Sequence, residues 1–275
     1  MKSFIEKMPK AELHLHIEGT LEPDMMLALA KKNEVSLSYK NNDEVKSAYQ
    51  FKDLQSFLDL YYQGMQVLQS QEDFYQLTWA YLERCAQQNI IYCEIFFDPQ
   101  AHMARGILFE TVLDGIEQAT LQAKEQLGVE AKIIFSILRH LTESEAEALL
   151  DIAIQHKSRL IGMGLDSTEK GNPPEKFKNV FKRAGEAGFY RVAHAGEEGD
   201  ASYVSGALTL LGVDRIDHGN NAMQDSALLH ELKDREVALT LCPLSNFRLQ
   251  VVSDHKSHPL KQMFDMGLKV TINSD

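Results

Sequence analysis

The sequence predicts an α/β protein of the TIM-type (β/α)8 barrel class. Apolar strand-like runs alternate with amphipathic helical stretches along the whole chain, and eight strand-like runs can be recognised. The length of 275 residues also suits one barrel of this class. No G-x-G-x-x-G pattern follows an early strand, which weakens the alternative of an open, doubly wound sheet. We therefore expect residues 1–275 to form a single barrel domain.

The first predicted strand ends with two histidines. Apolar and polar residues alternate over residues 12–19, and this period of two is typical of a strand. His14 and His16 share one face because side chains two residues apart point the same way. Histidine is the commonest metal ligand, so the pair suits a divalent metal ion. The alternative is two unrelated histidines, one of them hydrogen-bonded in a core.

The remaining elements follow in alternation. Helices are expected over residues 22–33, 51–69, 72–89, 109–127, 143–156, 173–187, 202–211 and 223–234. Strands are expected over residues 90–97, 131–138, 160–165, 190–194, 215–218, 237–242 and 268–273. Pro23 suits a first helical turn, and Gly128 and Gly188 suit helix ends. The sequence stops at Asp275, so we expect a C-terminally incomplete barrel whose last helix is missing.

Composition excludes several classes of function. The formal net charge of −12 opposes non-specific binding to nucleic acid and favours a small or uncharged substrate. No apolar run approaches the roughly 18 residues of a membrane span, and the first residues lack the apolar region of a signal peptide. We therefore expect a cytoplasmic protein that binds no membrane. Cys85, Cys93 and Cys242 are scattered without a C-x-x-C, which argues against disulfides and a cysteine-based metal site.

Further polar residues stand at the ends of predicted strands. His194 ends the fifth strand, with Glu197 three residues later, His218 ends the sixth, and Asp275 follows the eighth. In TIM-type barrels the carboxyl ends of the strands form one ring, where the chemistry takes place. Together with the two histidines of the first strand, these residues predict a metal site. Three imidazoles and one carboxylate favour zinc, with iron or manganese as alternatives.

Two residues of this constellation suit roles in catalysis. A bound zinc ion lowers the pKa of its water from 15.7 to about 7. Glu197 is close enough along the chain to His194 to carry a proton without binding the metal. His218 is then available to hydrogen-bond and orient the hydroxide. The alternative for Glu197 is a solvated loop carboxylate beside Glu198 and Asp200.

The other histidines are weaker candidates for the predicted site. His102 and His140 follow the second and third strands, where they are candidates for lining the barrel mouth, although a structural role is favoured. His156 and His230 fall on predicted helices, where a solvated position is favoured. His258, next to Pro259, is expected to start a helix.

The motifs together resemble those of the adenosine/adenine deaminase family. The resemblance rests on residues 9–19, 194–197, 217–219, 242–246 and 273–275, which occur in family order. It implies a TIM-type barrel, one zinc ion per chain, and hydrolytic removal of a purine 6-amino group. It also implies a role for each matching residue: His14, His16, His194 and Asp275 as zinc ligands, Glu197 as proton donor to the purine, and His218 as the residue that assists the hydroxide.

The resemblance also bears on the choice of purine. Adenosine deaminases typically carry Asp in the pattern H-x-H-x-D-G, where it reaches the ribose, whereas this chain has Glu18. Glutamate is one methylene longer and would intrude where a ribose should lie. Residues 164–174 and 242–246 also look like the adenine branch. We therefore expect deamination of adenine to hypoxanthine and ammonia in purine salvage, with adenosine or N6-substituted purines as alternatives.

Two competing functions belong to other classes. Family members continue after Asp275 with a second Asp that contacts purine N7, so the chain as it stands is expected to have reduced activity or to be a non-catalytic purine-binding barrel. A barrel hydrolase acting on a cyclic amide or a phosphoester is the other alternative. Many such enzymes use a carboxylated lysine on the fourth strand. The predicted fourth strand, residues 160–165, contains no lysine.

Overall fold

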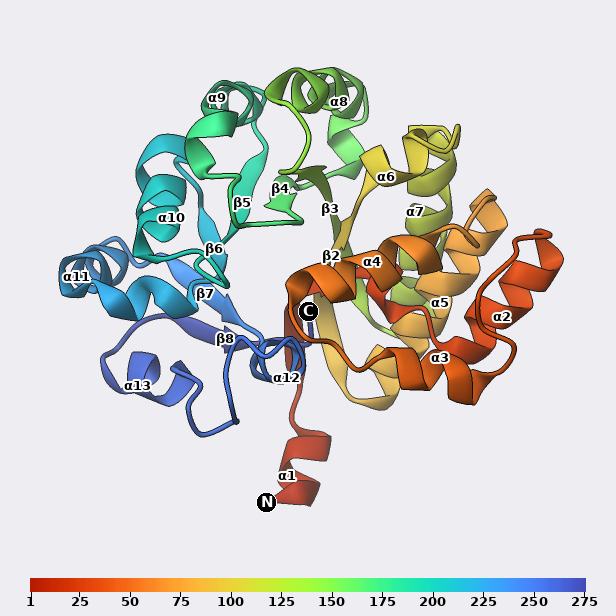
Figure 1. Ribbon diagram of the computed structural model, residues 1–275, viewed down its shortest axis with the longest axis horizontal. Coiled ribbons are helices and arrows are strands. Elements are labelled where there is room, and N and C mark those ends of the chain that lie inside the picture. The colour runs from red at the N-terminus through yellow and green to blue at the C-terminus, as the bar shows by residue number, and fades with distance from the viewer. The chain divides into compact units, whose positions relative to one another are not determined.

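The computed structural model describes residues 1–275 and contains eight strands in one sheet (Figure 1). The strands are β1 (Lys10–His16), β2 (Ile90–Phe97), β3 (Glu130–Leu138), β4 (Gly162–Asp166), β5 (Tyr190–Ala195), β6 (Arg215–His218), β7 (Ala238–Leu241) and β8 (Val270–Ile272). They follow one another in sequence order across the sheet, and β1 pairs with β2 in parallel, as do β3 to β8 in succession. This is the strand order of a (β/α)8 barrel, as predicted.

The chain divides into two compact units, Met1–Ile133 and Ile134–Asp275. The boundary falls inside β3. A single domain over residues 1–275 stays a prediction. None of the helices in either unit combines the length and the apolar character needed to cross a lipid bilayer.

The first unit surrounds β1 and β2 with helices. These are α1 (Lys2–Lys7), η1 (Ile17–Thr20), α2 (Pro23–Lys32), α3 (Asn42–Ala48), α4 (Leu54–Met65), α5 (Gln71–Gln87), α6 (Pro99–Met103) and α7 (Phe109–Gln126). Two of them begin with capping boxes, in which Asp53 pairs with Ser56 and Ser70 pairs with Asp73. These reciprocal hydrogen bonds satisfy backbone N–H groups that have no partner inside the helix and so define where α4 and α5 begin.

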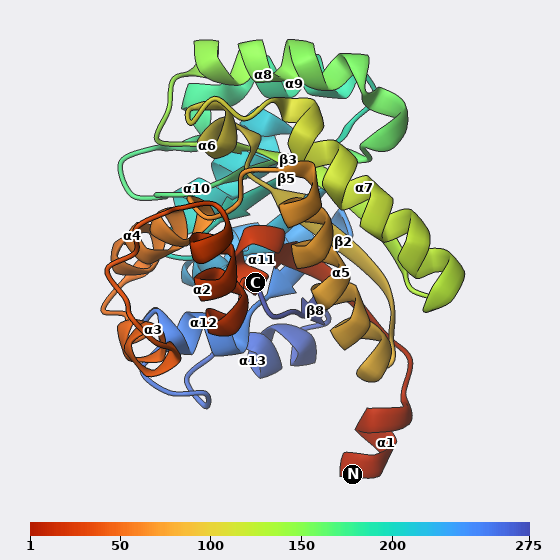
Figure 2. The same ribbon diagram turned by 90° about the vertical axis from the view of Figure 1, so that its right-hand side faces the viewer.

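Helices α5 and α7 lie side by side in this unit (Figure 2). Gly115 allows this close packing, because a Cβ atom at its position would meet the backbone oxygen of Gln71 and lie 2.7 Å from the Cβ atom of Phe74. Phe74 of α5 and Val112 and Ile116 of α7 are fully buried. The sequence therefore places a glycine in the interior of α7 where the packing distance requires one, despite its low helix propensity.

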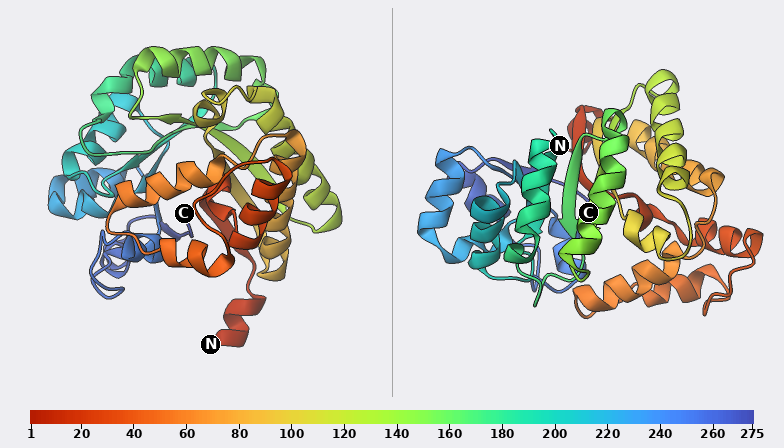
Figure 3. Two further views of the ribbon diagram at one scale, coloured as in Figure 1. Left: turned by 45° about the vertical axis from the view of Figure 1, so that its right-hand side comes forward. Right: turned by 90° about the horizontal axis from the view of Figure 1, so that it is seen from above.

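The second unit continues the alternation of strands and helices. Its helices are α8 (Glu143–Gln155), η2 (Lys157–Arg159), η3 (Pro174–Phe177), α9 (Lys178–Glu186), α10 (Ala201–Gly206), η4 (Ala207–Leu211), η5 (Asn220–Gln224), α11 (Ser226–Asp234), α12 (Pro243–Arg248) and α13 (Leu260–Asp265). Helices α8 to α11 follow the outer side of β4 to β7, as the labels of Figure 1 and the same colours in Figure 3 show. All residues of β4 and β6 are buried, as expected for parallel strands covered on both faces.

Helices α1, α3 and α6 are short helices of the first unit that have no counterpart among the expected elements. Helix α1 buries none of its residues, so it has no apolar face to produce a periodic signal. Helix α3 buries only Val45 and is defined instead by its cap, the Asn41 side chain, which accepts a hydrogen bond from the Glu44 N–H. Helix α6 has five residues and starts at Pro99, because a proline that ends a strand can also occupy the first turn of a helix.

Candidate active site and metal centre

Strand β5 brings His194 to its carboxyl end in a buried position. The Nδ1 atom of His194 lies 3.1 Å from the carbonyl oxygen of Leu165. A carbonyl oxygen can only accept, so Nδ1 carries the ring proton and Nε2 presents a lone pair. Histidines that bind metals commonly donate their other ring N–H to such an acceptor. The arrangement of His194 therefore fits a metal ligand that binds through Nε2.

The segment after β5 is held by a second carboxylate, Glu169. Its Oε1 atom accepts a hydrogen bond from the Gly196 N–H at 2.6 Å, and its Oε2 atom accepts from the N–H groups of Glu198 and Gly199, both at 2.8 Å. Gly196 has a φ of 72°, and a Cβ atom there would collide with Val204. The loop that carries Glu197 is therefore built around one buried carboxylate and one glycine.

Glu197 itself is buried and points toward two polar side chains. The Asn246 Nδ2 atom donates a hydrogen bond to its Oε1 atom at 3.0 Å. Its Oε2 atom lies 3.5 Å from His218 Nε2. The side chain is thus oriented by α12 on one side and by the end of β6 on the other.

The surroundings of Glu197 favour its protonated form. Burial raises the pKa of this carboxyl group well above its usual range. The negative charges of Asp275, Glu169 and Glu198 raise the pKa further, while the hydrogen bond from Asn246 opposes the shift. A neutral carboxyl group can donate its proton at neutral pH, whereas an ordinary glutamate cannot.

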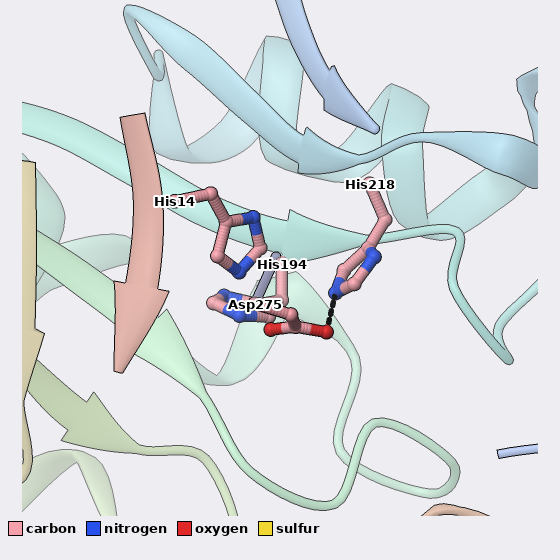
Figure 4. Close-up of side chains that lie close together, drawn as sticks. All are labelled: His14, His194, His218 and Asp275. Atoms are coloured by element: carbon pink, nitrogen blue, oxygen red, sulfur yellow. Dashed lines mark ion pairs between the residues drawn. The ribbon is translucent and has the colours of Figure 1, made fainter. Parts of the chain in front are cut away.

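His218 ends β6 in a left-handed backbone conformation, with a φ of 66°. Its ring centroid lies 5.2 Å from that of His194, and its Nε2 atom lies 3.7 Å from Asp275 Oδ2 (Figure 4). A positive φ at a histidine costs energy and is common at functional sites. Here it turns the ring toward His194 and Asp275.

Asp275 follows β8, and the side chain of Ser245 holds its carboxylate. The Ser245 Oγ atom donates a hydrogen bond to Asp275 Oδ2 at 2.6 Å. Ser245 belongs to α12, the same short helix that carries Asn246. One turn of helix after β7 therefore contacts two of the predicted site residues, Asp275 and Glu197.

The second unit brings three possible metal ligands together. One ligand atom from each of His194, His218 and Asp275 lies within 4.8 Å of the other two (Figure 4). In the first unit, His14 and His16 lie on β1, as predicted, with their ring centroids 5.6 Å apart. The predicted ligand set contains His14 and His16 and not His218, and that choice stays a prediction.

Glu18, the residue used to choose the purine, is completely enclosed. Its Oε1 atom accepts hydrogen bonds from the Asp98 N–H at 3.0 Å and from His102 Nε2 at 2.9 Å, and its Oε2 atom accepts from the Tyr61 hydroxyl at 3.2 Å. Burial raises the pKa of Glu18, but the hydrogen bonds and charge of His102 and the Asp98 N–H lower it by more. Glu18 is therefore a fixed, ionised acceptor.

Several residues of this site were not singled out for a role by sequence reasoning. Arg139 is fully buried at the end of β3, and its Nη1 atom donates to the backbone carbonyl of His194 at 2.7 Å. Glu169, Ser245 and Asn246 hold site residues through the hydrogen bonds described above. The first lies in residues 164–174 and the others in residues 242–246, the two stretches that resemble the adenine branch, but a resemblance assigns no contact. His102 was only a candidate for the barrel mouth, and it contacts Glu18 instead.

The chain is similar in sequence to known proteins of one family. The family model described as Adenosine deaminase matches residues 9–275. An adenine deaminase from Psychrobacter cryohalolentis is 52% identical over 275 residues, which are all of this chain and 83% of that protein. An adenine deaminase from Rhodospirillum rubrum is 54% identical over 273 residues, 99% of this chain and 82% of that protein.

A solved structure supports the same assignment. The crystal structure of adenine deaminase from Arthrobacter aurescens superposes with a TM-score of 0.95 at 48% identity, covering 97% of this chain and 82% of that one. This likeness confirms the predicted TIM-type barrel, and the relatives confirm that the chain is an enzyme. The chain belongs to the adenosine deaminase family, within its adenine deaminase branch.

Proposed function

We propose that this chain is a zinc-dependent hydrolase that converts adenine and water into hypoxanthine and ammonia, in purine salvage. The observation that carries the proposal is the buried carboxyl group of Glu197, whose pKa is raised well above its usual range by burial and by neighbouring negative charge. It lies beside His218, which belongs to a group of residues that could hold a metal ion. A neutral acid next to a metal site suits hydrolytic deamination of a purine.

The metal would be held by His14, His16, His194 and Asp275. Neutral imidazoles and a carboxylate are ligands that zinc binds. The Nδ1–H of His194 already donates a hydrogen bond to the Leu165 carbonyl oxygen, so Nε2 is the nitrogen that would bind the metal. When bound, zinc supplies a water molecule that ionises near neutral pH. A related amidohydrolase from Burkholderia ambifaria, 28% identical over the whole of this chain, contains bound zinc, which supports the choice of ion.

The residues of the chain divide the proton transfers between them. Glu197 donates its proton to purine N1, which makes C6 electrophilic enough for water to add. His218 orients the attacking water, and Asp275 accepts a proton from it. That proton passes to the 6-amino group, which leaves as ammonia, while the new C6 hydroxyl group returns a proton to Glu197 and so becomes the carbonyl group of hypoxanthine. Glu197 and Asp275 thus act as acid and base at neutral pH because their surroundings differ.

Glu18 supports adenine rather than adenosine as the substrate. It is one methylene longer than the aspartate typical of adenosine deaminases, and three hydrogen bonds from Asp98, His102 and Tyr61 prevent it from moving aside. A base without a ribose does not need the space that Glu18 occupies. Adenosine and N6-substituted purines are the substrates against which this choice is to be tested.

The experiment combines metal analysis with product analysis. Metal-free protein, prepared with a chelator, should form no hypoxanthine from adenine, and one equivalent of zinc should restore the reaction. His194→Ala should also lower the zinc content of the purified protein. Full hypoxanthine formation by metal-free protein would refute the metal requirement. A zinc-loaded protein that forms no hypoxanthine would refute adenine deamination itself.

A further inference from the structure

The side chain of Asn246 is buried, and its orientation can be deduced from its neighbours. The Leu260 N–H donates to His258 Nδ1 at 3.1 Å, so Nδ1 of this ring is an acceptor. A ring nitrogen that accepts carries no proton, so the proton of His258 is on Nε2, and burial, which lowers the pKa of His258, favours the same neutral form. His258 Nε2 lies 3.1 Å from Asn246 Oδ1 and donates to it. Asn220 Nδ2 donates to the same oxygen at 2.7 Å.

These two donors leave only one orientation for the Asn246 amide. Its oxygen faces Asn220 and His258, so its Nδ2 group must face the opposite way. There it lies 3.0 Å from Glu197 Oε1 and 3.4 Å from His218 Nδ1. The amide therefore donates to Glu197, and the network behind it prevents the flip that would turn an oxygen toward the carboxyl group.

We propose that Asn246 is a positioning residue for deamination, because it reserves Glu197 Oε1 as an acceptor and so places the transferable proton on Oε2. In a protonated carboxyl group the carbonyl oxygen accepts hydrogen bonds and the hydroxyl oxygen donates. With Oε1 bound to the amide, Oε2 is the hydroxyl oxygen. This inference rests on the proposed function, in which Glu197 protonates the purine.

The contact of Asn246 with His218 extends the same effect. Because Nδ1 of His218 accepts from Asn246, a neutral His218 ring carries its proton on Nε2. That nitrogen lies 3.5 Å from Glu197 Oε2, the oxygen that becomes negatively charged after the proton has moved to the purine. A single amide thus sets the proton positions of the acid and of its neighbour before the substrate arrives.

The test is a double-mutant cycle on adenine turnover by zinc-loaded protein. Asn246→Ala should lower kcat about 10- to 100-fold, leave KM within about twofold, and leave the zinc content unchanged. Glu197→Gln should lower kcat on its own. In the Glu197→Gln background, Asn246→Ala should cause little further loss, because the group through which it acts is gone. Equal losses in both backgrounds would refute the positioning role.

Two further variants keep the test decisive. Asn246→Asp retains the shape of the side chain and loses the Nδ2 donor, so it should lose as much kcat as the alanine variant, and full activity in it would overturn the proposal. Asn33→Ala is the matched control, because the Asn33 amide donates only to Val67 O and Asp73. It should lower stability without lowering kcat. If Glu197→Gln itself is fully active on adenine, the acid role given to Glu197 in the proposed function fails, and not only the inference.

Discussion

Glu18 and Glu197 are both buried carboxyl groups, and their surroundings shift their pKa values in opposite directions. Burial raises the pKa in each case. At Glu18 the hydrogen bonds and charge of His102 and the Asp98 N–H outweigh burial and lower the pKa. At Glu197 the negative charge of Asp275 adds to burial and raises the pKa. Glu18 is therefore a fixed acceptor, and Glu197 suits the proposed role of proton donor.

Glu197→Gln is predicted to remove the acid and keep the shape of the site. The amide cannot deliver a proton to purine N1, so kcat on adenine should fall by about 10²- to 10⁴-fold. Zinc content and thermal stability should change little, because Glu197 is not a proposed ligand. Steady-state kinetics and metal analysis of the purified variant check this. An unchanged kcat would assign the proton transfer to another residue.

The sequence allowed some residues of the site to be selected and not others, for a physical reason. His194, Glu197 and His218 could be selected because titratable residues at the carboxyl ends of barrel strands face the site where the chemistry takes place. Asn246 and Glu169 could not, because their importance lies in contacts with residues about 30 to 50 positions away. An amide or a carboxylate in a loop has no periodicity that marks such a contact in advance.

The conformation of the loop after β5 depends on Glu169, a residue that follows β4. Glu169 accepts hydrogen bonds from three backbone N–H groups of residues 196–199. Glu169→Gln should destabilise the protein by about 1.5–3 kcal/mol, because an amide oxygen replaces a charged acceptor and an amide group faces N–H donors. It should also lower kcat, since the loop carries Glu197. Urea unfolding and adenine kinetics measure the two effects. Neither effect should appear in the control variant Glu175→Gln, because Glu175 is exposed.

The stability that the contact between α2 and α5 contributes is predicted to depend on pH. This contact joins Lys32 of α2 to Asp73 of α5. Asp73 is buried, and although burial raises its pKa, hydrogen bonds from Lys32 and from the backbone N–H groups of Gln69 and Ser70 lower it by more. A lowered pKa adds stability above the unfolded-state value of about 3.9, and this stability is lost as the pH falls through the folded-state pKa.

The test of this contact compares Asp73→Asn with the unchanged chain. The variant should be less stable by about 1–3 kcal/mol at pH 7, and the difference in unfolding free energy should shrink below about pH 4. Urea titrations at pH 7, 5 and 3 measure it. A difference in unfolding free energy that stays constant over this range would show that the charge of Asp73 does not stabilise the contact between α2 and α5.

Elements with a strong periodic pattern were predictable, and short capped ones were not. The strand starting at Lys10 and the long helix α7 follow from alternation and from a helical apolar face. Helix α3 has a single buried residue, so only its Asn41 cap could have revealed it. The 3₁₀ turn η1, which contains Glu18, lies inside the predicted strand, and it changes the direction of the chain directly after His16.

For the whole molecule, the order of the elements was the most predictable property. Strict alternation of strands and helices leaves few arrangements, because parallel neighbours need helical crossovers of one hand. The sequence therefore indicated which strand ends carry the titratable residues of the predicted site. It did not indicate how Glu18 is enclosed, since the His102 and Tyr61 contacts join residues 84 and 43 positions from it.

An assay with two substrates shows directly whether the chain deaminates adenine and whether it discriminates against adenosine. Zinc-loaded protein of verified mass is given adenine and adenosine in parallel, and ammonia release is measured, with Glu197→Gln as the control for contaminating activity. We expect ammonia from adenine, little or none from adenosine, and a large loss in the variant. Ammonia from adenosine alone would contradict the role given to Glu18, and zinc-loaded protein inactive on both would contradict the function.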